Sequence, residues 1–142
     1  MKTNKEVLSS ILKTTQMGQM GIRSVQKAAI GAELKQALAD QLREYDCIET
    51  QAHEIASQRG WRLPELSPGL RKMTDMMTRM QLNGRNTDSK IAGMMIKGNT
   101  KGVITGTKNL HHHENPDSKI TALAQRLLDH ENANIRQMET FL

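Results

Sequence analysis

The sequence predicts an all-α protein built as a four-helix bundle. Leu, Ala, Met, Gln, Lys and Glu dominate the 142 residues, whereas Trp, Tyr and Phe occur once each, so aromatic strand formers are scarce. Apolar residues recur at helical spacing over four long stretches, which indicates amphipathic helices. The connections between these stretches are short in each half of the chain and long in the middle. A single domain over residues 1–142 is expected, because this length suffices for one hydrophobic core.

The first two helices are expected to form an antiparallel hairpin. Thr3-Asn4-Lys5-Glu6 has the pattern of a capping box, in which the Thr and Glu side chains satisfy free N–H groups at a helix start. This helix is expected to end near Ala28–Gly31, where glycine allows the chain to turn. The second helix is expected over residues 32–59, with Gly60 ending it. The short joint requires the two helices to run in opposite directions.

The connection over residues 60–87 is long enough to cross the full length of a bundle. Ser67 and Pro68 form an N-cap followed by a proline in the first helical turn. A short amphipathic helix is predicted from there to about Leu82. Its apolar positions are Leu70, Met73, Met76, Met77 and Met80.

The last two helices are expected to form a second antiparallel hairpin. The third long helix is predicted over residues 88–110, with Asn86 or Thr87 as its cap. The last helix is predicted over residues 116–140, with the pair Asn115-Pro116 as its cap and first residue. The ten methionines of the chain favour helix interfaces filled by flexible, unbranched side chains.

Three glycines stand four residues apart in the third long helix, at Gly98, Gly102 and Gly106. Each glycine in a helix interior costs about 1 kcal/mol relative to alanine. Their shared face predicts close packing against another helix, either within the chain or in a dimer. The alternative is a locally weak helix.

Composition and charge narrow the range of function classes. The formal net charge of +5 allows an acidic partner, but the basic residues are scattered and aromatic stacking residues are nearly absent, which disfavours nucleic acid. Cys47 is the one cysteine, so no disulfide framework is expected. The first residues lack the apolar core of a signal peptide, and no segment has the roughly 20 apolar residues that span a membrane. No membrane contact and a cytoplasmic location are therefore expected.

The second helix closes in Gln58-Arg59-Gly60-Trp61-Arg62-Leu63-Pro64. This ending and the two-hairpin connectivity resemble the ferritin-like superfamily, and in particular the spore coat protein F-like bacterial proteins. The resemblance implies a ferritin-like four-helix bundle in which one long crossover joins two hairpins. Many members of this superfamily carry a carboxylate-bridged di-iron or di-manganese centre, whereas others have lost it.

The sequence lacks the ligand pattern of that di-metal centre. The pattern requires one Glu from each of two helices and a Glu-x-x-His motif from each of the other two. Glu49 is followed three residues later by Ala52, and Glu131 is followed by Asn134. In place of the two single glutamates, the remaining helices offer Gln16 or Gln19 and Asn99, Lys101 or Thr105. No metal or other cofactor is therefore expected.

Glu49 and Glu131 are instead expected to belong to a polar network in the core, because a lone buried carboxylate costs several kcal/mol unless it is paired or protonated. The candidate partners are Lys101, Gln19, Asn134, Thr105 and Tyr45. The alternative is a noncanonical metal site made of Glu49, His53 and Glu131. His53 lies on the flank of the apolar stripe, roughly 80° from its centre, which weakens that ligand set.

No catalytic residue is predicted. Cys47 lies in mid-helix without a nearby base on its face, and the glycine-rich stretch over residues 98–109 lacks the ending of a phosphate-binding loop. The run His111-His112-His113-Glu114 lies in a turn, where consecutive histidines cannot all reach one ion without strain.

The sequence therefore predicts a non-enzymatic structural or interaction protein, and the resemblance implies a connection with a spore coat or a stress state. The alternative is a noncanonical metal-binding ferritin-like protein with oxidoreductase or metal-storage activity. A third possibility is a basic protein that binds nucleic acid. A homodimer, or an unknown protein partner, is expected to use the methionine-rich short helix and the glycine face.

Overall fold

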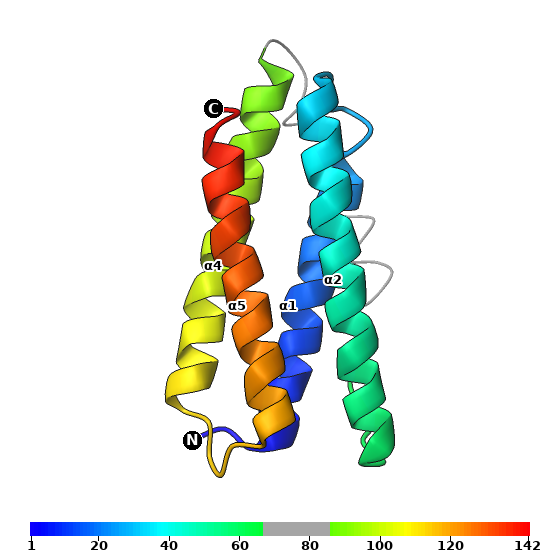
Figure 1. Cartoon of the computed structure of the whole chain (residues 1–142), viewed down its shortest axis with the longest axis vertical. Coiled ribbons are helices and arrows are strands. Elements are labelled where there is room, and N and C mark those ends of the chain that lie inside the picture. The colour runs from blue at the N-terminus through cyan, green and yellow to red at the C-terminus, as the bar shows by residue number, and fades with distance from the viewer. Residues whose placement is uncertain (67–85) are drawn as a thin grey trace.

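The computed structural model of the chain describes residues 1–66 and 86–142 and contains four α-helices in these ranges (Figure 1). The helices are α1 (Asn4–Val25), α2 (Ala32–Gln58), α4 (Thr87–His111) and α5 (Ser118–Glu139). They pack side by side as a bundle, which confirms the predicted all-α four-helix class. The short helix predicted from Ser67 to Leu82 lies outside the described residues.

The helices form two antiparallel hairpins, α1–α2 and α4–α5, as predicted (Figure 1). The end of α2 and the start of α4 lie at opposite ends of the bundle, so the link between the hairpins joins one end to the other. At the start of α4, the Asp88 carboxylate accepts hydrogen bonds from the N–H groups of Ile30 and Gly31, both at 2.8 Å. Along the side of the bundle, Arg126 on α5 donates two hydrogen bonds to Glu44 on α2, at 2.7 and 2.8 Å.

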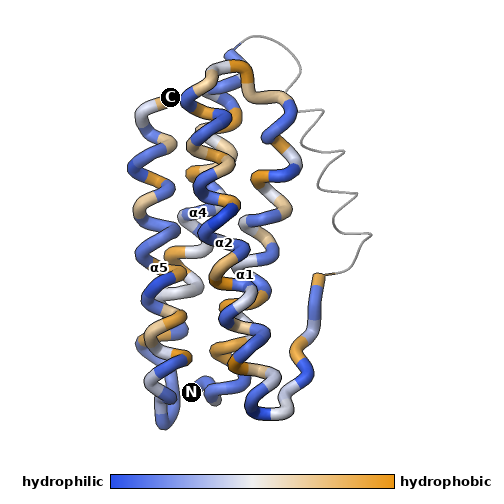
Figure 2. The backbone as a smooth tube through the Cα atoms, turned by 45° about the vertical axis from the view of Figure 1, so that its right-hand side comes forward, coloured by the Kyte–Doolittle hydropathy of each residue, from blue (hydrophilic) through white to orange (hydrophobic). Residues whose placement is uncertain are grey.

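The core consists of one apolar face from each helix. Hydrophobic residues recur along every helix with polar residues between them (Figure 2). The largest fully buried aliphatic side chains include Leu8, Leu12, Ile22, Leu34, Leu38, Ile48, Ile91 and Ile120. Burying one such side chain contributes roughly 1.5–3 kcal/mol relative to leaving it in water, so the periodicity in the sequence determines how the helices face one another.

Two helix boundaries differ from the predicted ones by more than one residue. The first helix ends at Val25, three residues before the predicted Ala28–Gly31. The last helix begins at Ser118 with Asp117 as its N-cap, where Asn115 was predicted. The Asp117 carboxylate accepts from two backbone N–H groups of the first turn, and an acidic group is favoured at the positive end of a helix. Asn115 instead adopts a left-handed turn conformation, with φ of 45°.

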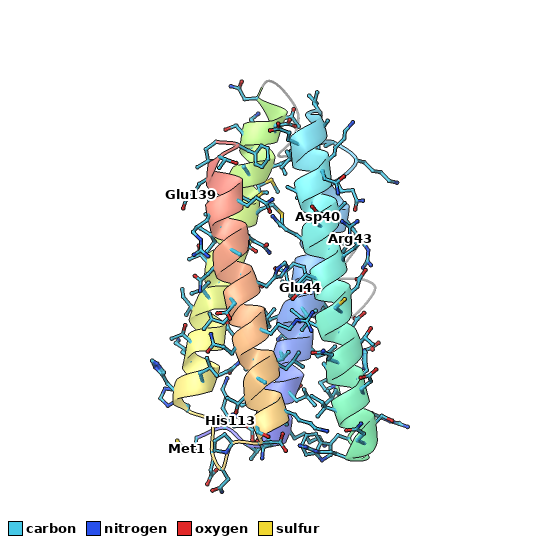
Figure 3. All side chains as sticks on the ribbon, in the orientation of Figure 1. Met1, Asp40, Arg43, Glu44, His113 and Glu139 are labelled. Carbon is cyan, nitrogen blue, oxygen red and sulfur yellow. The ribbon has the colours of Figure 1, made fainter. Side chains whose placement is uncertain are left out.

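The N-terminus is fastened to the turn between α4 and α5. The Asn4 side-chain oxygen accepts from the Asp117 N–H at 2.9 Å and lies 2.6 Å from His113 Nε2, and the Asn4 amide donates to the Asn115 carbonyl at 3.1 Å. The backbone of Lys2 adds two hydrogen bonds to the same turn. Figure 3 shows Met1 and His113 at this end of the bundle. Of the three consecutive histidines only His113 is buried, and it serves this junction.

Replacing Asn4 by alanine is expected to lower the free energy of unfolding by about 2 kcal/mol, because the junction loses three hydrogen bonds worth about 0.5–1.5 kcal/mol each. Urea unfolding followed by circular dichroism measures this loss. Asn132→Ala is the matched control, since Asn132 has no side-chain hydrogen bond among the described residues. Equal effects of the two substitutions would contradict the role given to Asn4.

Candidate functional site

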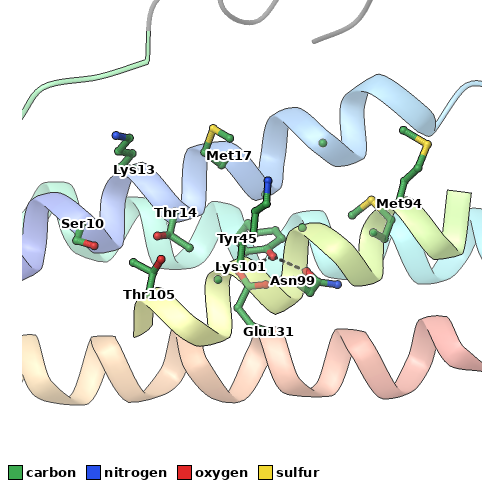
Figure 4. Close-up of a pocket in the computed structure, with 15 residues that line it drawn as sticks. Ser10, Lys13, Thr14, Met17, Tyr45, Met94, Asn99, Lys101, Thr105 and Glu131 are labelled. Carbon is green, nitrogen blue, oxygen red and sulfur yellow. Dashed lines mark hydrogen bonds between the residues drawn. The ribbon is translucent and has the colours of Figure 1, made fainter. Parts of the chain in front are cut away.

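A cavity of about 440 Å³ lies between α1 and α4 and is called the α1–α4 cavity below (Figure 4). Its floor is formed by Tyr45 from α2, Asn99 from α4 and Glu131 from α5. Its walls and mouth are formed by methionine and lysine side chains of α1 and α4, which include Met17, Met94, Met95, Lys13 and Lys101. The floor is polar and the walls are mainly apolar, as is common in sites for small molecules.

The floor is a hydrogen-bonded cluster centred on Tyr45. The Tyr45 hydroxyl lies 2.8 Å from Glu131 Oε1 and 3.3 Å from Asn99 Oδ1. The exposed fractions of the three residues are 0% for Tyr45, 2% for Glu131 and 3% for Asn99. One hydroxyl hydrogen cannot serve both oxygens. A protonated Glu131 that donates to Tyr45, which in turn donates to Asn99, gives every oxygen at these two contacts a hydrogen.

The electrostatics of the floor favour that neutral arrangement below about pH 7. Burial raises the pKa of the Glu131 carboxyl to about 7, although the hydrogen bond with Tyr45 acts in the opposite direction. Burial and the neighbouring Glu131 raise the pKa of the Tyr45 hydroxyl, so Tyr45 is neutral at physiological pH. Glu131 therefore changes its charge near neutral pH at the centre of the bundle.

Two glycines make room for this cluster. A Cβ atom at Gly18 on α1 would lie 2.4 Å from Tyr45 Cζ, and a Cβ atom at Gly102 on α4 would lie 2.7 Å from Glu131 Cδ. Both distances are too short for non-bonded carbon atoms. The rigid Tyr45 ring therefore requires glycine at position 18, whereas a side chain at position 102 would force the end of the Glu131 side chain to move. Of the three glycines predicted to form a packing face, Gly102 and Gly106 lie against α5, with Gly106 facing Leu128 at ordinary contact distance. Gly98 does not pack in this way and lines the cavity instead.

The predicted polar network is divided into separate groups. Glu49 is half-buried and accepts hydrogen bonds at 3.3 Å from the side-chain amides of Gln16 and Gln19. Gln19 also donates to Asp46 at 2.8 Å. Within the described ranges no hydrogen bond joins Glu49 to Glu131. The reason is geometric, because Glu49 faces α1 near the edge of the hairpin, whereas Glu131 points between all four helices.

Of the remaining predicted members, Asn134 interacts with the Tyr45 hydroxyl, whereas Lys101 lies at the cavity mouth. Asn134 is buried and its amide lies 3.1 Å from His130 Nε2. The His130 ring meets the edge of the Tyr45 ring, with 4.5 Å between the ring centroids, and burial lowers the pKa of His130. Lys101 is exposed at the cavity mouth, and in the described part of the chain no ion pair connects it to Glu131.

The alternative metal ligands Glu49, His53 and Glu131 are not brought together. His53 is exposed, and its Nε2 lies 3.7 Å from Glu65. Across residues 1–66 and 86–142, no three His, Cys, Asp or Glu side chains form a group that could hold a metal ion. Hard and borderline metals need several such side chains at bonding distance, so these three residues do not form one site.

Charge is unevenly distributed over the helices that border the cavity. The range of α4 contains four lysines and one aspartate, and the range of α1 contains two lysines and one arginine against one glutamate. The range of α2 contains six acidic residues against two basic ones. The cavity therefore opens between the two basic helices of the bundle. Charge scanned along the whole sequence does not reveal this separation, because it appears only when residues are grouped by helix.

The site and fold together define a helical bundle with an interhelical cavity. No protein-family model matches this sequence, and no curated protein sequence matches it. The crystal structure of a conserved hypothetical protein, rv2844, from Mycobacterium tuberculosis is similar with a TM-score of 0.75 and 14% identity, covering 98% of this chain and 96% of that chain. The crystal structure of a DUF305 fragment from Deinococcus radiodurans has a TM-score of 0.76 and 13% identity, covering 96% and 93%. These likenesses show the fold of this chain.

Alanine at Gly18 is expected to destabilise the fold, whereas alanine at Gly98 is expected to stabilise it. At Gly18 the new methyl group would meet three atoms of the fully buried Tyr45 ring at 2.8 Å or less, and such overpacking costs typically about 1–3 kcal/mol. At Gly98 it would meet no described atom within 4 Å, so the gain in helix propensity of up to about 1 kcal/mol remains. Urea unfolding of both variants measures the difference. Effects of the same sign would show that the Tyr45 ring does not limit space at Gly18.

Glu131→Gln is expected to remove a pH-dependent loss of stability. The pKa of Glu131 is about 7 in the folded chain and 4.5 ordinarily, so its protonated form is favoured by folding. The contribution is fully present below pH 4.5 and is lost as the pH rises through 7, amounting to about 3 kcal/mol. The unfolding free energy of Glu131→Gln minus that of the unchanged protein should therefore rise by about 3 kcal/mol from pH 4 to pH 9.

His130 titrates in both proteins, so its contribution to the unfolding free energy cancels when the two values are subtracted. A difference that stays constant with pH would mean that Glu131 does not titrate abnormally in the folded chain.

Proposed function

We propose that this protein is a non-enzymatic binding protein, a ferritin-like bundle that carries a ligand cavity in place of a di-metal centre. The observation on which this proposal rests is the α1–α4 cavity with its buried polar floor. Its volume lies within the roughly 300–1,000 Å³ common for small-molecule sites. Asn99 Nδ2 is buried at this floor and has no hydrogen-bond partner in the described part of the chain.

Glycines along the cavity support a binding role over a purely structural one. Gly21 and Gly98 line the cavity, and a Cβ atom at either would meet no described atom within 4 Å. Close packing within the described helices therefore does not require these two glycines, although each costs about 1 kcal/mol of helix stability relative to alanine. Protein interiors are normally filled to high density. An open space maintained at this cost is consistent with an occupant.

The resemblance to ferritin-like proteins supports the same reading of the bundle centre. The two-hairpin connectivity and the Gly60-Trp61 ending of the second helix support that relationship. A role in a spore coat or stress state, a cytoplasmic location and a homodimer stay predictions from the sequence. Among the described helices, none is long and apolar enough to cross a membrane.

A small-molecule screen by ligand-observed NMR tests the proposal, with a mixture of anionic, neutral and cationic aromatic and aliphatic compounds. Three proteins are compared: the unchanged chain, Gly98→Leu, which places a side chain in the cavity, and Gly93→Leu as the matched control. Gly93 lies on the same helix, also has free space at Cβ, and does not line the cavity. Compounds should bind the unchanged chain and Gly93→Leu but not Gly98→Leu.

Two results would overturn the proposal. The first is that no compound of any charge class binds in a manner sensitive to Gly98→Leu. The second is that the protein retains stoichiometric iron or manganese after anaerobic incubation with the metal ions and desalting, and loses this metal in Glu131→Gln. That second result would favour the alternative of a metal-binding or metal-storing bundle.

A further inference from the structure

We propose that the α1–α4 cavity binds a small anionic amphiphile: a molecule with a carboxylate or sulfonate group, an apolar body and a carbonyl-type hydrogen-bond acceptor. This inference rests on the proposed binding function and adds the chemical class of the ligand. Three features of the cavity support it independently, namely the charge at its mouth, the chemistry of its walls and the free donor at its floor.

The mouth of the cavity favours an anion. Lys13 on α1 and Lys101 on α4 both line the cavity and are exposed, and neither has an ion-pair partner in the described ranges. Figure 4 shows Lys13 on α1 and Lys101 on α4 at the cavity. Both helices carry an excess of basic residues, so the surrounding field attracts anions and repels cations.

The chemistry of the floor disfavours an anionic group deep in the cavity, so this group is expected at the mouth. The Glu131 carboxyl lies at the floor, so an anion there would be repelled whenever Glu131 is ionised and would also lose its hydration. An anion at the lysines keeps its contact with water. The negative end of the ligand is thus expected to point outward and the remainder inward.

The walls suit an apolar body of variable shape. Met17, Met94 and Met95 line the cavity from α1 and α4. Met17 has an exposed fraction of 46%, which is high for a large apolar side chain. Methionine is flexible and polarizable, and it adapts to irregular or aromatic partners. The small residues Gly21 and Gly98 leave space between these side chains.

The floor offers one hydrogen-bond donor. With the Asn99 amide oriented so that Oδ1 faces the Tyr45 hydroxyl, Asn99 Nδ2 is a buried donor with no partner among the described residues. Buried polar groups are nearly always hydrogen-bonded in native proteins. A carbonyl oxygen on the inward part of the ligand would satisfy this donor. A ligand that places only hydrocarbon there leaves this donor without a partner and is expected to bind less tightly.

The test uses 4-benzoylbenzoate, which has a carboxylate, two aromatic rings and a ketone. Isothermal titration calorimetry compares it with 4-(hydroxymethyl)benzophenone, which is neutral, 4-(aminomethyl)benzophenone, which is cationic, and 4-benzylbenzoate, which lacks the ketone oxygen. Irradiation of the bound ketone also attaches it to nearby C–H groups, so mass spectrometry locates the site. The proteins are the full chain, Gly98→Leu, Gly93→Leu, Asn99→Leu and the double variant Lys13→Gln/Lys101→Gln, each checked for folding by circular dichroism.

The anion is expected to bind about fivefold more tightly than the neutral analogue, with the cation weakest. Loss of the ketone oxygen should weaken binding roughly three- to tenfold. Gly98→Leu should abolish binding, whereas Gly93→Leu should not change it. The lysine double variant should remove the preference for the anion, and Asn99→Leu should remove the preference for the ketone. Photo-attachment is expected at Met17, Met94 or Met95.

The possible negative results distinguish an error in the ligand class from an error in the proposed binding function. Equal binding of the anionic and neutral compounds, still abolished by Gly98→Leu, would overturn the anionic class and leave the binding function standing. Failure of all four compounds, together with a screen without hits, would overturn both. A third result is co-sedimentation with phosphatidylglycerol vesicles that requires the two lysines but is unaffected by Gly98→Leu. That result would overturn the inference in favour of a surface that recognises anionic lipid headgroups.

Discussion

The buried hydrogen bond between Tyr45 and Glu131 is the constraint to which the centre of the bundle is adapted. It joins α2 to α5 across the core at 2.8 Å, and it brings a ring and a carboxyl group into a space where helices normally pack through aliphatic side chains. The two helices that face this pair have glycine at the contact points, Gly18 and Gly102. The Tyr45 ring and the Glu131 carboxyl group thus occupy the space that side chains at these two positions of α1 and α4 would need, and the cavity lies beside them.

The sequence was sufficient to predict the four long helices, their hairpin pairing and a connection that joins opposite ends of the bundle, because all three follow from apolar periodicity and from connection lengths. It was insufficient for the site, because site geometry depends on how far each helix rotates about its axis. Glu49 and Glu131 each follow the apolar stripe of their own helix, yet only Glu131 points to the centre, whereas Glu49 faces the amides of α1. The roles of Asn99 and Gly18 in the site follow only from their position beside Tyr45, which the sequence does not show.

The misplaced start of the last helix has a similar origin. Asn115, Pro116 and Asp117 are all common at helix starts, so residue preferences alone do not decide which of them is the N-cap. The choice depends on a long-range contact, because Asn4 accepts a hydrogen bond from the Asp117 N–H and donates one to the Asn115 carbonyl. Local residue preferences are therefore enough to predict the turn, whereas the contacts of Asn4 determine which residue caps the helix.

Besides the contacts along α2 and α5, polar contacts fasten the two hairpins to each other at both ends of the bundle: Asn4 and Arg59 with the α4–α5 turn, and Asp88 with the α1–α2 turn. These clamps belong to the hairpins themselves, so none of them depends on the covalent link from α2 to α4. The bundle can accordingly be regarded as two complementary halves, residues 1–66 and 86–142. Each half thus carries groups at both of its ends that are complementary to groups on the other half, so the register of one hairpin against the other is set twice, once at each end.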